Sequence, residues 1–121
     1  MDLHEIIKKF SIITGLSDEE VSPWTSICED ACLEIRKNLR EDADEESNSR
    51  RLNSAAAALA FYRYVLYCSS GGGVESFTTG EIRVKTDAQT SVKIAYTAWI
   101  DAKRSIADIL KDEDFMFERI I

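Results

Sequence analysis

The chain has 121 residues, of which 45% are hydrophobic and 31% charged, and its net charge is −7. This length fits one domain with a modest core, and the composition is ordinary for a soluble globular protein. The apolar run from Leu52 to Cys68 is too short to span a membrane and contains Arg63, so it predicts a buried helix. Early acidic residues in 1–10 argue against a secretory signal. Three cysteines, an odd number, argue against a disulfide framework and for reduced thiols.

The negative charge is concentrated in one segment. Residues 17–48 carry eleven acidic and three basic residues, whereas the rest of the chain is close to neutral. A negative surface repels phosphate, which disfavours sequence-independent nucleic-acid binding. Two small basic clusters, at 50–51 and at Arg83 with Lys85, are the positions where DNA could still bind. The simpler interpretation of the acidic run is a solvated helix face and a loop. We therefore expect the carboxylates of 41–46 to lie in solvent, with nothing to perturb their pKa values.

Two helices are predicted in the N-terminal third. A first helix should end at Gly15, a residue that suits a left-handed stop; its apolar positions are Leu3, Ile6, Ile7, Phe10 and Ile13. Ser17 and Glu20 form a capping box, and 22–23, Ser-Pro, is an equally good helix start. Both starts lead into one apolar stripe, which consists of Trp24, Ile27, Cys28, Ala31, Ile35 and Leu39. This second helix should end within the acidic stretch 41–46.

Two further helices are predicted in the rest of the chain. The third is the most apolar, and its alanine-rich stretch 55–60 would let another helix approach closely. Its face comprises Leu52, Ala55, Ala56, Leu59, Tyr62, Val65 and Leu66, and it should end before the glycine triplet 71–73. The fourth should begin near Asp87, a suitable N-cap, and end at the acidic residues 112–114; its face comprises Val92, Ala95, Tyr96, Trp99, Ile106, Ile109 and Leu110. The fold class is therefore mainly α: one domain, 1–121, built as a bundle of about four helices.

Two segments do not fit a simple bundle. Residues 74–86 contain two short β-like runs around Gly80, which predicts a hairpin or extended insertion between the third and fourth helices. Such a hairpin is marginal in water, so it either packs on the bundle or gains a strand from a partner. The tail, 113–121, holds five large apolar residues and either caps the bundle or docks on a neighbour. The predicted subunit or partner interface comprises Phe77, Gly80, Ile82, Arg83, Val84, Lys85, Phe115, Met116, Phe117, Ile120 and Ile121.

The sequence predicts no catalytic, cofactor or metal site. His4 is the one histidine and has no evident partner for acid–base chemistry, so a surface or packing role is favoured. Cys28 and Cys32 share a helix face, but this spacing alone is a weak metal signal, and both, like Cys68, should pack as small hydrophobes. The common phosphate-binding and nucleophile motifs are absent, and no helix start follows the glycine triplet. These features argue against an enzyme.

The order of the predicted elements is similar to that of a known family. It comprises a first helix, an acidic-capped second helix (S17-D-E-E20), an alanine-rich third helix (L52-N-S-A-A-A-A-L-A-F-Y-R-Y64), the segment S76-F-T-T-G-E-I-R-V84, and a last amphipathic helix with Trp99. From about residue 3 to 110, the chain resembles the head–tail connector proteins (adaptor or head-completion proteins) of long-tailed bacteriophages and prophages. The S-F-x-x-G-x-I-x-V segment is the distinctive piece, and the glycine triplet and the apolar ending depart from the family pattern.

The resemblance implies a structural role with no catalytic residues. Such adaptors bind under the portal vertex of the filled capsid as a ring of identical subunits, extend the DNA channel and present a surface to the next neck or tail protein. The insertion 74–86 would contact a neighbouring subunit or the portal protein, and the tail would reach a neighbour or the portal. DNA would pass without specific binding, helped by the negative segment 17–48 if that segment faces the channel. No membrane is involved.

The same resemblance implies a location in the virion neck, and in the host bacterial cytoplasm during assembly. The residues alone leave an alternative of another class. A small acidic helical protein could bind and mask a basic partner protein, as inhibitor or immunity proteins do, and the charge of 17–48 is the feature that supports it. A masking protein would be a monomer or dimer with one tight basic partner.

Overall fold

The structure, a computed structural model, describes residues 1–70 and 88–111, which form a small bundle of helices with no β-strand among them. The elements are α1 (Leu3–Thr14), α2 (Asp18–Val21), the 3-10 turn η1 (Ser22–Trp24), α3 (Thr25–Lys37), α4 (Ser49–Ser70), α6 (Ala88–Ser105) and the 3-10 turn η2 (Ala107–Ile109). The predicted mainly α class is confirmed. The insertion 74–86 and the tail 113–121 lie outside the described residues.

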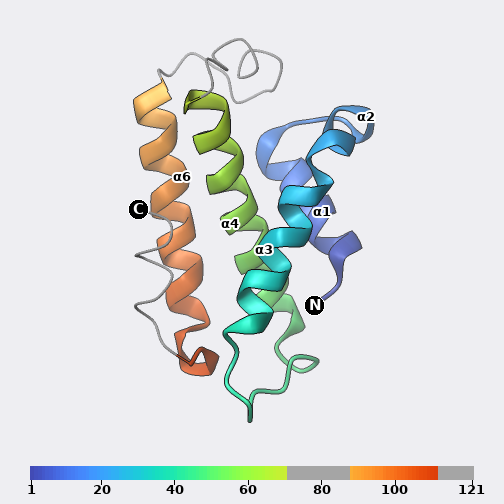
Figure 1. Cartoon of the computed structure of the whole chain (residues 1–121), viewed down its shortest axis with the longest axis vertical. Helices are drawn as coiled ribbons and strands as arrows, with labels where there is room; N and C mark the ends of the chain where they lie inside the picture. The colour runs from blue at the N-terminus through green and yellow to red at the C-terminus, as the bar shows by residue number, and fades with distance from the viewer. Residues whose placement is uncertain (71–87, 112–121) are drawn as a thin grey trace.

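The central element is α4. It packs against α6 on one side and against α1 and α3 on the other (Figure 1). The alanine-rich stretch 55–60 is buried throughout, and small side chains let helix axes approach one another closely. Because three helices cover α4, its buried residues run round most of its circumference instead of forming one stripe.

The ends of α1 lie where the sequence predicts them. The Asp2 side chain caps the helix by accepting a hydrogen bond from the backbone N–H of His4 at 3.0 Å. Gly15 adopts a φ of 78°, and its N–H donates to the Ser11 carbonyl oxygen at 2.9 Å. A residue without a Cβ adopts this left-handed conformation with little strain, which is why the helix stops there.

The last turn of α1 differs from the prediction in the side chain that it buries. Ile13 was expected on the apolar face but is 43% exposed, and Thr14 is buried in its place. The buried positions are spaced by four, so Thr14 follows Ile6 and Phe10. Its hydroxyl donates to the Phe10 carbonyl oxygen at 2.9 Å, which satisfies the one polar atom that this register buries.

Both predicted starts of the second helix are used. The backbone N–H of Ser17 donates to the Glu20 carboxylate at 2.9 Å, and the N–H of Glu20 donates to the Ser17 hydroxyl at 3.2 Å, which completes the capping box of α2. Pro23 then lies in the first turn of η1, where its missing N–H costs nothing, and α3 continues from Thr25.

Two helices end earlier than predicted. α3 ends at Lys37, before the acidic stretch, and α6 ends at Ser105, well before 112–114. Beyond these ends the two chain segments pair: Leu39 and Leu110 form an isolated antiparallel bridge. Its hydrogen bonds run from Arg40 N–H to the Ile109 oxygen and from Lys111 N–H to the Asn38 oxygen, each at 2.8 Å. The expected N-cap of α6, Asp87, lies outside the described residues.

Candidate interaction surfaces

The residues that the sequence predicts as an interface all fall in 71–87 or 112–121, outside the part of the chain that the structure describes. Predictions about them remain predictions. Among the other residues singled out, His4 is exposed on α1, and the three cysteines are buried and form no disulfide.

The thiols lie in surroundings that disfavour the thiolate. Burial raises the pKa of Cys28 to about 12, and burial also raises that of Cys68 although a hydrogen bond with Tyr64 opposes it. Cys32 lies against the Met1 sulfur at 4.0 Å. Over 1–70 and 88–111 there is no cluster of three or more His, Cys, Asp or Glu side chains that could hold a metal ion. The thiols contribute packing in this fold.

A surface pocket with aromatic walls lies where η1 and the start of α3 meet the last turns of α4. We call it the aromatic pocket; it has a volume of about 390 Å³ and is lined by Pro23, Trp24, Ser26, Ile27 and Tyr67. Trp24 is half-buried, whereas the Tyr67 side chain is 64% exposed, and their ring centroids are 5.5 Å apart in an edge-to-face arrangement. Paired aromatic side chains at a surface are typical of protein-binding sites.

The walls of the aromatic pocket are fixed by the core beneath them. The Trp24 ring packs edge-on against Tyr64 at 4.7 Å, and Tyr64 packs edge-on against Phe10 at 5.6 Å. Both inner rings are buried, and burial raises the pKa of Tyr64 to about 12. A continuous stack of rings therefore runs from the core to the surface, so the pocket is preorganised for an apolar group.

The described residues that line the aromatic pocket are uncharged, but the stretch of chain that forms one of its walls is acidic. Residues 17–35 contain six acids and no bases. Glu29 and Asp30 are exposed and lie one helical turn beyond Ser26, on the same side of α3. On α4, the basic residue nearest to Tyr67 in the sequence is Arg63, one helical turn before it, and its side chain is half-buried. The pocket therefore suits an apolar group that is flanked by positive charge.

A second apolar surface lies on α1. Ile12 is 75% exposed, the most of any large apolar side chain in the described part, and Ile13 is 43% exposed. We call these two residues, with Lys8 and Lys9, the isoleucine ridge. Two hollows flank Ile12, and they are lined by Lys9, Ile13, Ser54 and Ala57 on one side and by His4, Ile7, Lys8, Ser11, Asp18 and Val21 on the other. Lys8 and Lys9 beside this surface are matched in number by Glu5 and Asp18, so the isoleucine ridge with its neighbours has no net charge.

The acidic segment 17–48 does not form one surface. Its first part, in α2 and α3, begins at one end of the bundle, and the loop that joins α3 to α4 lies at the opposite end (Figure 1). The predicted single negative field is therefore divided between two places.

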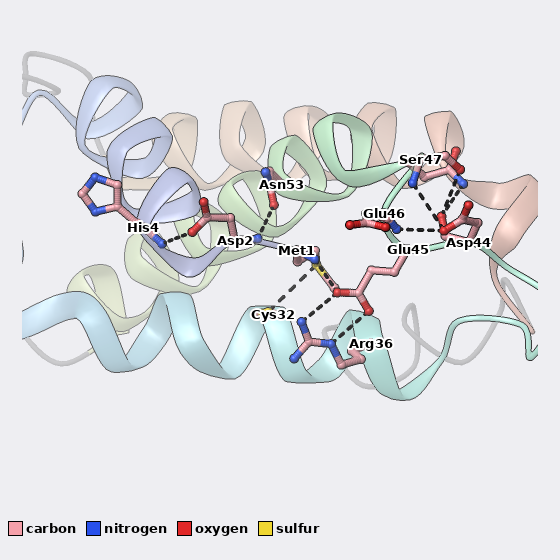
Figure 2. Close-up of polar contacts among 11 residues, drawn as sticks. Met1, Asp2, His4, Cys32, Arg36, Asp44, Glu45, Glu46, Ser47 and Asn53 are labelled. Atoms are coloured by element: carbon pink, nitrogen blue, oxygen red, sulfur yellow. Dashed lines mark hydrogen bonds and ion pairs between the residues drawn. The ribbon is translucent and has the colours of Figure 1, made fainter.

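One carboxylate in this loop is not a solvated charge. The Arg36 guanidinium and the α-ammonium of Met1 both bind the Glu45 carboxylate, and Figure 2 shows the two cations converging on it. These hydrogen bonds, that of Arg36 first, lower the pKa of Glu45 to about 2. The expectation that nothing perturbs the carboxylates of 41–46 is wrong for Glu45, because the loop folds back onto α3 and the chain start.

In the basic cluster at 50–51, Arg51 takes part in contacts that hold the fold together. The Arg51 guanidinium binds the Asp108 carboxylate at 3.0 Å and the Ser105 carbonyl oxygen, which fixes the end of α6 to α4. Arg50 remains exposed. The other cluster, Arg83 with Lys85, lies outside the described residues.

Sequence reasoning missed Ile12 and Tyr67 and assigned Trp24 to a buried stripe. A signal was present, because Ile12 and Tyr67 are large apolar residues that fall between the core positions of their helices. Such residues are common singly. Ile12 and Tyr67 become candidates for an interaction surface only when the fold shows which residues lie beside them.

Comparison with known proteins found no significant match. No family model matches the chain, and none of the curated proteins or solved structures is significantly similar to it. No helix in the described ranges is long and apolar enough to cross a bilayer.

Proposed function

We propose that this chain is the ring-forming subunit of a head–tail connector in a bacteriophage or prophage neck. The observation that supports it is the presence of two unlike apolar surfaces on one small bundle. One is aromatic, around Trp24 and Tyr67, and the other is aliphatic, around Ile12. Subunits that meet head to tail need two different surfaces, and closed rings of identical chains are built in this way.

The order of the sequence elements supports the placement of this ring in a phage neck. As a connector, the ring would dock under the portal protein, and its far side would receive the next neck or tail protein. DNA would pass through without specific binding. The loop at 41–46 is suited to the channel wall, because exposed carboxylates such as those of Glu41 and Glu46 repel the phosphate backbone. This orientation fails if charge mapping of an assembled ring puts the loop on its outer side.

A gene deletion tests the proposed function. Loss of the gene from the encoding phage or prophage should leave DNA-filled heads without tails, visible by electron microscopy of the lysate. A plasmid copy of the wild-type gene is the control and should restore tailed particles. Tailed, infectious particles from the deletion strain would contradict a connector role.

The aromatic pocket and the acidic stretch 17–35 also favour a second candidate function, the masking of a basic partner protein. A tight one-to-one complex in which a lysine or arginine of the partner stacks on Trp24 would be expected. Masking gives no role to the isoleucine ridge on α1, which is why we prefer the connector. An inhibitor would lose its activity in Trp24→Ala but keep it in Ile12→Ser, whereas a ring subunit would be impaired by both.

A further inference from the structure

We draw no further inference here: the strongest candidate, the aromatic pocket where η1 and the start of α3 meet the last turns of α4, is an apolar surface lined by uncharged side chains, and nothing in the described part of the structure shows what covers it.

Discussion

Arg36 and Glu45 form a two-point ion pair across the turn between α3 and α4. The Arg36 Nε atom donates to one Glu45 carboxylate oxygen at 3.1 Å, and an Nη atom donates to the other at 2.8 Å. The α-ammonium of Met1 binds the same carboxylate (Figure 2). One acidic side chain in the loop therefore ties together the end of α3, the start of the chain and the approach to α4.

This ion pair predicts a pH-dependent stability. The folded pKa of Glu45 is about 2, below the ordinary value of 4.5, so its contribution is complete above about pH 5 and is lost as the pH falls toward 2. Because Arg36 and Glu45 are both partly exposed, we expect about 1 kcal/mol and not the full value of the shift. In urea unfolding, Glu45→Gln should be less stable than the wild type by about this amount at pH 7.

The gap between the two proteins should have narrowed to a small fraction of its pH 7 value by pH 2, where about half of the Glu45 carboxylates of the folded wild type are protonated. Glu46→Gln, which removes the neighbouring exposed carboxylate, is the control and should stay within about 0.5 kcal/mol of the wild type at pH 7. A Glu45→Gln gap that is constant from pH 7 to pH 2 would show that the ion pair does not stabilise the fold.

The buried thiols predict slow chemical modification. Cys28, Cys32 and Cys68 are buried, and burial raises the pKa values of Cys28 and Cys68, so little thiolate exists at pH 8. Ellman's reagent should label the native chain slowly and should label all three thiols at once in 6 M guanidinium. Rapid labelling of one thiol in the native chain would contradict the burial of that side chain.

The packing of α6 on α4 predicts a sharp contrast between two of its large residues. Trp99 is 1% exposed and Ile94 is 56% exposed. Trp99→Ala should lower the free energy of unfolding by about 3–5 kcal/mol, since it leaves a large cavity, and Ile94→Ala should change it by less than about 0.5 kcal/mol. Chemical denaturation of both variants measures the difference, and similar losses would mean that α6 is rotated from the orientation described.

The insertion carries its own prediction. Replacing Ile82 and Val84 with lysine should leave far-UV helicity nearly intact and prevent assembly, because the sequence predicts that these residues form the apolar face of the second β-like run. Loss of helicity in this double variant would instead place the run in the core of the bundle.

The helices could be predicted from the sequence wherever residues close together in the chain determine where a helix begins and ends. Leu3 to Gly15 carries both an apolar period and a glycine stop, and Ser17 with Glu20 is a capping box that needs no tertiary contact. The apolar face of α4 and its alanine-rich stretch 55–60 could also be predicted, because a helix that is buried on several sides has few polar residues.

The remaining features depend on residues far apart in the chain. α3 ends at Lys37, and Leu39 beyond it pairs with Leu110, a partner that no helical period reveals. The lowered pKa of Glu45 comes from Arg36 and Met1, which only the folded loop brings to it. The aromatic pocket forms because the end of α4 lies beside η1, which places Tyr67 next to Trp24.

Native mass spectrometry of the purified full-length chain, over a wide concentration range, tests the central claim most directly. We expect a closed oligomer of many identical subunits that grows in abundance with concentration. A species that stops at a dimer at every concentration would contradict the ring and would favour a masking protein.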